Sequence, residues 1–221
     1  MITLGHHTTG GPDDGPPVVL LHALGSSALT WERFTTALPR RSIALDLRGH
    51  GTSPHTGDYS FATMADDVLA FLDEHGHATV DLVGHSLGGG VAQHVAMRDP
   101  DRVRRMVVED ICPPPHELVG VLEPPAKPPE PVDFDWAVVE PIFRLVRTPN
   151  PAWWAGLSRI TADTLWLAGG SSSHVDQARL REAAAHLPSV QLVEIPVGHR
   201  IHGLAFDVFR NWHVTSTAQV A

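Results

Sequence analysis

The sequence predicts an α/β fold built around a mostly parallel sheet. Short apolar runs alternate along the chain with segments of helical periodicity, and this alternation is typical of βαβ units. Residues 17–21 are apolar throughout, as expected of an inner strand that is covered on both faces. A single domain accommodates all 221 residues. The runs of strand length are residues 17–21, 42–46, 80–83, 103–111, 164–168 and 191–195.

The remaining elements follow from local signals. We expect a short first strand around residues 2–4, ahead of the Gly- and Pro-rich turn at 10–17. Residues 61–75 carry apolar side chains at helical spacing, with acids on the other side. Prolines limit two other helices, which end near residues 38 and 99. Further helices are expected at residues 31–38, 90–97 and 177–187, and a closing helix at 204–209.

An irregular insertion separates the strands at 103–111 and 164–168. Residues 113–131 are rich in proline, which disfavours a packed helix or strand there. Aromatic and aliphatic residues then recur at helical intervals. We interpret residues 112–156 as a short lid with an extended arm. Its tryptophans, Trp136, Trp153 and Trp154, are interpreted as packing residues rather than as a cofactor site.

Composition excludes several classes of function. A formal net charge of −9 argues against nucleic acid or an anionic membrane as a partner. The single cysteine, Cys112, suits a reducing compartment, and no apolar run is long enough to span a bilayer. The N-terminal residues lack the pattern of a secretory signal. We therefore expect a soluble cytoplasmic protein whose partner is a small molecule. We assign no metal, because no H-E-x-x-H, cysteine pair or tight His/carboxylate cluster stands out.

Residues 84–88 read Gly-His-Ser-Leu-Gly and fit the pattern G-x-S-x-G. The pattern follows a predicted strand and precedes a predicted helix, so Ser86 lies at the apex of a sharp turn. Glycine two positions away on each side allows the strand and the helix to pass closely. Such a turn exposes the serine oxygen, and Ser86 is the candidate nucleophile.

A serine hydroxyl needs a base that accepts its proton, and histidine titrates in the right range. His199 follows the last predicted strand in a Gly-His turn, at the edge of the sheet where sites of parallel α/β proteins gather. His199 is therefore the candidate base, and His202 is its closest competitor.

The third residue is a carboxylate that orients the histidine and stabilises its charged form. Asp110 comes directly after the strand that follows the nucleophile helix, and we favour it. Asp176 is the alternative, although a helix N-cap explains that residue equally well. We expect Glu109, on the opposite side of the strand, to be a solvated strand-end acid.

Two backbone amides can stabilise the oxyanion of an attacked carbonyl. The amide of Leu87 directly follows the nucleophile, and the amide of Leu24 lies in the loop after an early strand. We expect His22 to brace that loop. Asp46 and Arg48 are expected to tie loops together near the site.

The segments LLHALGSS, LDLRGHGTS, DLVGHSLGGG and VGH, in this order, resemble the α/β-hydrolase superfamily of esterases, lipases and related enzymes. The resemblance implies that Ser86 is the nucleophile, that His199 is the base, and that Leu24 and Leu87 form the oxyanion hole. The loop at 169–175 lacks the aspartate that the family usually places there. Some members place the acid after the preceding strand, which matches Asp110.

These residues predict a cofactor-independent serine hydrolase acting on a small carboxylic ester, thioester or lactone. The serine at position 86 argues against epoxide hydrolases and haloalkane dehalogenases, whose families attack with a carboxylate. Hydrolysis of a C–C bond by the same three residues is an alternative. A ligand-binding protein that keeps the scaffold without turnover is another.

Overall fold

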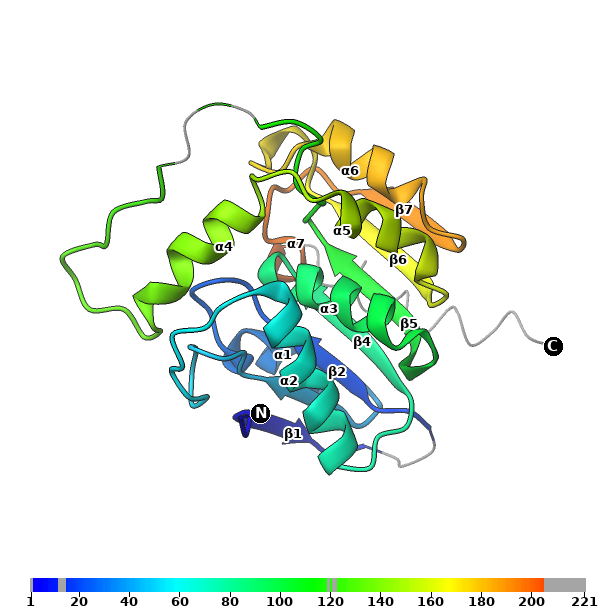
Figure 1. Cartoon of the computed structure of the whole chain (residues 1–221). Helices are drawn as coiled ribbons and strands as arrows, with labels where there is room; N and C mark the ends of the chain where they lie inside the picture. Colours follow the sequence, from blue (N-terminus) through cyan, green and yellow to red (C-terminus); the bar gives the residue numbers. More distant parts are fainter. Residues whose placement is uncertain (1, 12–14, 119, 121–122, 205–221) are drawn as a thin grey trace.

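The computed structural model describes residues 2–11, 15–118, 120 and 123–204 of the chain. Its centre is a seven-stranded sheet in the order β1-β3-β2-β4-β5-β6-β7, in which only β1 is antiparallel to its neighbour (Figure 1). The α/β fold with a mostly parallel sheet is thus confirmed. The strands are β1 His6–Thr9, β2 Val18–Leu21, β3 Ser42–Leu45, β4 Val80–His85, β5 Val103–Glu109, β6 Asp163–Ala168 and β7 Val190–Glu194.

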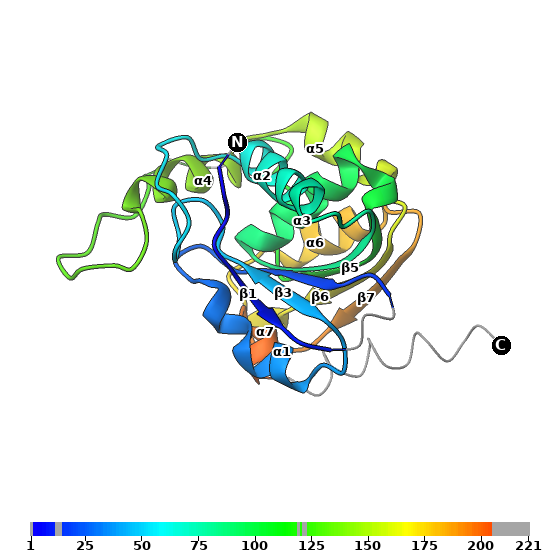
Figure 2. The same cartoon turned by 90° about the horizontal axis from the view of Figure 1, so that it is seen from below.

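The helices lie on both faces of the sheet (Figure 2). Helices α2, α3, α5 and α6 cover one face, and α1 and α7 cover the other. The helices are α1 Glu32–Ala37, α2 Phe61–Glu74, α3 Leu87–Arg98, α4 Val139–Leu145, α5 Pro151–Gly156, α6 Gln177–Ala184 and α7 Ile201–Leu204. Short 3-10 turns are η1 Ala28–Trp31, η2 Pro100–Arg102, η3 Trp136–Val138, η4 Leu157–Arg159 and η5 Gly170–Ser172. Across the described ranges, the helices are too short or too polar to cross a lipid bilayer.

The first strand differs from the expectation. It lies at His6–Thr9 rather than at residues 2–4, and it pairs antiparallel with β3 from His6 opposite Leu45 to Thr9 opposite Ser42. Leu4 precedes the strand and is buried in the core instead. An edge strand buries little of its surface, so polar residues can form it, and the apolar side chain of Leu4 contributes to the core without belonging to a strand.

The insertion between β5 and β6 is partly packed on the body of the protein. Trp153 and Trp154 are buried, and the indole N–H of Trp153 donates to Oε1 of Gln93 in α3 at 2.8 Å. The interpretation of these tryptophans as packing residues fits their contacts. The arm before α4 reaches away from the sheet (Figure 1). The function of residues 112–156 as a lid stays a prediction. Of the closing helix expected at 204–209, all but Leu204 lies outside the described residues.

The approach of α3 to the sheet depends on two glycines. A Cβ atom on Gly88 would lie 2.3 Å from the carbonyl oxygen of Leu21, and one on Gly84 would lie 2.3 Å from the carbonyl oxygen of Gly88. Real Cβ atoms do not approach backbone oxygens this closely, so larger side chains would force β4, α3 and β2 apart. Glycine at these two positions sets the sharp turn between β4 and α3.

We predict that Gly88→Ala lowers the free energy of unfolding by about 1–3 kcal/mol, since backbone must move to admit the methyl group. Chemical denaturation of the variant measures this loss. Gly10→Ala is the matched control, because a Cβ atom there meets nothing within 4 Å. Equal stability of the two variants would contradict the tight approach at Gly88.

Candidate active site

Ser86 sits between β4 and α3 with a strained backbone. Its φ of 51° and ψ of −115° are outside the conformations that residues with side chains commonly adopt. The Ser86 amide donates to the carbonyl oxygen of Glu109 at 2.9 Å, which ties the turn to the neighbouring strand β5. The strand, sharp turn and helix match the context that the G-x-S-x-G pattern requires.

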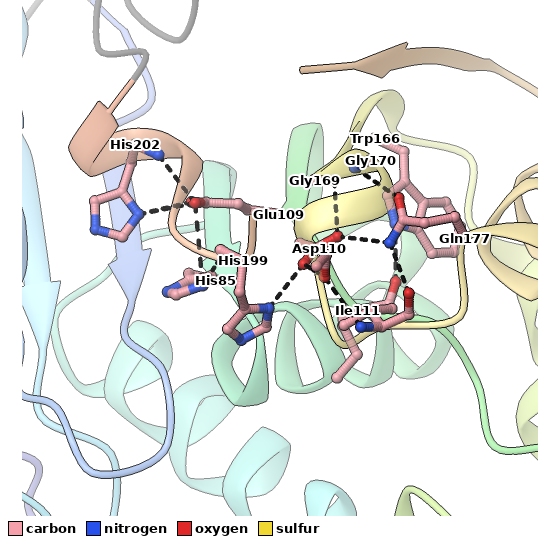
Figure 3. A network of polar contacts seen from close by, with 12 residues as sticks. His85, Glu109, Asp110, Ile111, Trp166, Gly169, Gly170, Gln177, His199 and His202 are labelled. Carbon is pink, nitrogen blue, oxygen red and sulfur yellow. Dashed lines mark hydrogen bonds and ion pairs between the residues drawn. The ribbon is translucent and has the colours of Figure 1, made fainter. Parts of the chain in front are cut away.

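His199 and Asp110 are in direct contact (Figure 3). Nδ1 of His199 lies 2.8 Å from Oδ2 of Asp110, which is fully buried, while a quarter of the His199 side chain is exposed. A carboxylate only accepts hydrogen bonds, so Nδ1 carries a proton, and in the neutral form of the ring Nε2 keeps its lone pair. The histidine is therefore oriented as a general base requires.

Asp110 is held by further donors from the loop after β6 and from the first residue of α6. The amide of Gly169 donates to Oδ1 at 2.8 Å, the amide group of Gln177 donates to the same oxygen at 3.2 Å, and the Ser173 hydroxyl donates to Oδ2. Burial alone would raise the pKa of Asp110, but these hydrogen bonds and the one from His199 outweigh it and lower the pKa. Asp110 is thus ionised at neutral pH.

The alternative acid has a different set of contacts. The Asp176 carboxylate caps α6, where it accepts from the amides of Ala178 and Arg179, and it pairs with the Arg179 guanidinium at 2.9 Å. Of the two candidate acids, Asp110 contacts His199. That Asp110 serves as the catalytic acid stays a prediction.

The expectation for Glu109 was wrong, because Glu109 is fully buried rather than solvated. Its carboxylate accepts from the backbone N–H of His202 at 2.9 Å and from Nδ1 of His202 at 2.8 Å. Burial would raise the pKa of Glu109, but the neighbouring His85 and His202 rings and the two hydrogen bonds from His202 outweigh it and lower the pKa. His202, the competitor of His199 for the role of base, is thus engaged by a different carboxylate (Figure 3).

His85 holds the same loop from the other side. Its Nε2 donates to the carbonyl oxygen of His199 at 2.8 Å. Burial lowers the pKa of His85 to about 4, so the ring is neutral near pH 7. The backbone that carries His199 is therefore fixed at residue 199 by His85 and at residue 202 by Glu109.

The structure also contains a cluster of possible metal ligands that the sequence motifs did not show. It consists of His85, Glu109 and His202. Their potential ligand atoms all lie within 4.8 Å of one another, close enough for a metal ion. However, the ring N–H of His202 already donates to Glu109, and that of His85 to His199. A metal would have to displace both protons and both hydrogen bonds, so the contacts favour a structural role.

The loop after β2 lies against the N-terminus of α3. The amide of Gly88 donates to the carbonyl oxygen of His22 at 3.1 Å, which brings the Leu24 loop and Leu87 to the same edge of the sheet. His22 accepts from the amide of Leu47 at 3.0 Å and donates to Ala23 at 2.8 Å. His22 thus braces the loop as expected. The oxyanion-hole role of Leu24 and Leu87 stays a prediction.

The loop contacts expected of Asp46 and Arg48 are present. Asp46 accepts from the amide of Ala28 at 2.7 Å and from the amide of Thr52 at 2.9 Å. Arg48 donates to the carbonyl oxygen of Asp58 in the next loop at 2.8 Å and forms a bidentate ion pair with Asp67 of α2. These two residues connect the loops around the site to each other.

A cavity of about 220 Å³ opens at Ser86. Sequence analysis did not identify most of its lining, nor the donors Ser173 and Gln177. The only signal for those donors was the polar, acid-free loop after β6. The residues that line the cavity are Ser86, Asp110, Ile111, Cys112, Val146, Arg147, His174, Val175, Asp176 and Arg179.

We predict that Glu109→Gln lowers the free energy of unfolding by about 1–3 kcal/mol, because the hydrogen bonds to His202 lose their charged acceptor and the new NH2 group faces the Nδ1 N–H of His202, which is also a donor. Urea denaturation measures the loss. Glu194→Gln in β7 is the control, since the Glu194 side chain is half exposed and pairs with Arg181 at the surface. Equal, small effects in both variants would show that Glu109 does not hold the loop.

Comparison with known proteins identifies the fold family of the chain. A family model for the alpha/beta hydrolase fold matches residues 16–156. The sn-1-specific diacylglycerol lipase ABHD11 of Mus musculus is 36% identical over 116 residues, which cover 51% of this chain and 38% of that protein. The putative carbamate hydrolase RutD of Variovorax paradoxus is 42% identical over 108 residues, which cover 47% of this chain and 41% of that protein. The matched part thus spans about two fifths of these relatives' length.

Solved structures agree over nearly the whole chain. The enol-lactonase from Burkholderia xenovorans superposes with a TM-score of 0.79 at 19% identity, covering 98% of this chain and 96% of that chain. A marine microorganism esterase superposes with a TM-score of 0.76 at 19% identity, covering 97% and 99%. At such identities the likeness is one of fold. Because the family model covers well over half of the 221 residues, the chain belongs to the family of proteins with the alpha/beta hydrolase fold.

Proposed function

We propose that the protein is a cofactor-independent serine hydrolase that cleaves small carboxylic esters, thioesters or lactones. The observation that carries this proposal is the hydrogen bond between His199 and the buried Asp110, at the cavity that contains Ser86. A histidine whose Nδ1 is held by a buried carboxylate, together with a serine on a strained turn at the same cavity, is the set of groups that makes a hydroxyl nucleophilic.

In the proposed reaction, the Ser86 oxygen attacks the carbonyl carbon while Nε2 of His199 takes the hydroxyl proton. The ionised Asp110 stabilises the imidazolium that forms. The amides of Leu24 and Leu87 stabilise the oxyanion. His199 then protonates the leaving alcohol or thiol, which leaves an acyl group on Ser86. Water, deprotonated by His199, releases the acid.

The cavity supports a small substrate. Its volume of about 220 Å³ is below the range of about 300–1,000 Å³ that is usual for drug-sized ligands. The side chains of Ile111, Val146 and Val175 give it apolar lining suited to a short acyl chain. Val146 belongs to the insertion, and we propose that residues 112–156 cover the site as a lid.

The relatives support the same class of reaction. Their names describe a diacylglycerol lipase, a putative carbamate hydrolase and, among solved structures, an enol-lactonase and an esterase. Each of these names implies attack on an acyl carbonyl. We extend that shared chemistry, and none of those particular substrates, to this chain.

We predict that a fluorophosphonate forms a single covalent adduct with the protein and none with Ser86→Ala. The probe reacts with activated serines and requires little knowledge of the substrate. Intact-mass spectrometry measures the adduct, and circular dichroism of both proteins controls for folding. A folded protein that stays unlabelled would contradict the proposal and favour a ligand-binding function.

We predict that Asp110→Asn lowers kcat by a factor approaching ~10⁴ on any ester that the protein hydrolyses. The asparagine can no longer act as the anionic acceptor for Nδ1 of His199. Asp176→Asn is the matched control, because Asp176 lines the same cavity but caps α6. Its kcat should stay within a few-fold of the original, and the reverse order of effects would assign the acid to Asp176.

A further inference from the structure

Arg147 lies at the cavity that contains Ser86. It follows α4 in the insertion and is exposed at the surface. The guanidinium carbon lies 3.8 Å from the centroid of the Phe143 ring, a cation–π contact that restricts the side chain to few conformations. The Arg147 guanidinium is therefore a partly ordered cation at the cavity in which a substrate of Ser86 would bind.

The other charged groups of the cavity are paired. Asp110 contacts His199, and Asp176 contacts Arg179 at 2.9 Å. Within residues 2–11, 15–118, 120 and 123–204, no carboxylate lies within ion-pair distance of Arg147. Arg144, three residues earlier, differs in this respect because it pairs with Glu140 at 2.9 Å. Among the described residues that line the cavity, Arg147 is thus the cationic side chain without a carboxylate partner.

His174 does not compete for an anion near neutral pH. Burial, the neighbouring His199 ring and the Arg147 charge together lower the pKa of His174 below its ordinary value, against the opposing effect of the Asp110 carboxylate, so the ring carries little charge near pH 7. The protein as a whole carries a net charge of −9 and repels anions at long range. Attraction of an anion to the site therefore depends on a local cation, and Arg147 supplies it.

We propose that Arg147 forms an anion subsite and that the preferred substrates are small esters, thioesters or lactones carrying a second, ionised carboxylate. The guanidinium binds that carboxylate through charge-assisted hydrogen bonds, while the ester carbonyl lies at Ser86. The apolar side chains of the cavity contact the short chain between the two groups. This inference rests on the proposed serine hydrolase function and adds the substrate class to it.

The test compares pairs of esters that differ only in charge. The mono-4-nitrophenyl ester of adipic acid is anionic, and 4-nitrophenyl methyl adipate is its neutral, methyl-capped counterpart. Release of nitrophenol is measured for the original protein, Arg147→Gln and Arg144→Gln, with Ser86→Ala supplying the spontaneous background. Arg144→Gln is the matched control, since it removes an arginine of α4 that does not line the cavity.

We expect Arg147→Gln to lower kcat/KM for the anionic ester at least about tenfold, the effect of losing one charge-assisted hydrogen bond. Activity on the neutral ester should stay within about twofold, and Arg144→Gln should change neither. Arg147→Glu should reverse the preference. The preference should also weaken as salt is added, because Arg147 is exposed.

Two outcomes would overturn the inference, and they differ in whether the proposed hydrolase function is also contradicted. If Ser86-dependent hydrolysis of both esters is unchanged in Arg147→Gln, the anion subsite is wrong and the hydrolase function stands. If neither ester is hydrolysed above the Ser86→Ala background and no fluorophosphonate adduct forms, the proposed function and the subsite fail together.

Discussion

The buried carboxylate of Asp110 is the interaction on which the rest of the site depends. A fully buried charge is stable only when hydrogen bonds replace its lost hydration, and here four groups do so. They come from His199, from Gln177 at the start of α6, and from the loop between β6 and α6. That loop, which has no acid of its own at residues 169–175, supplies donors to the acid of the neighbouring strand. The same carboxylate thus holds two loops at one edge of the sheet.

Two consecutive residues at the end of β4, and two at the end of β5, have different roles in the site. Each strand end presents one residue to the cavity, Ser86 or Asp110, and one buried residue, His85 or Glu109, to the loop at 199–202. Neighbouring residues at a strand end face different sides of the sheet, so two consecutive positions can serve both purposes. The orientation of His199 therefore depends on hydrogen bonds to the side chain of Asp110 and on backbone contacts made by its neighbours.

Local pattern predicted much of this structure, because strand periodicity and a sharp Gly-x-Ser-x-Gly turn are local properties. It could not predict that Glu109 is buried, because its partner His202 is 93 residues away in the sequence. Taken separately, Glu109 was expected to be solvated and His202 was a competitor for the role of base. The position of β1 was missed because an edge strand of His and Thr lacks an apolar signal. Arg147 was missed because the helical periodicity of the insertion indicates local structure only and does not place its residues against the sheet. These features arise from contacts between distant segments.

The insertion is braced at both ends of the segment that carries Arg147. Before α4, the Phe134 ring stacks on His50 at 5.4 Å, and the amide of Asp135 donates to the carbonyl oxygen of Gly49 at 2.7 Å. After α4, Trp153 is anchored to α3 through Gln93. His50 in turn accepts from the amide of Gly25, next to Leu24. The segment is therefore fixed to the loop expected to stabilise the oxyanion and to the helix that begins at the nucleophile. The backbone that carries Arg147 is thus tied to the same elements that carry Ser86 and Leu24, so the cavity lining at Arg147 is positioned relative to the nucleophile by contacts within the fold.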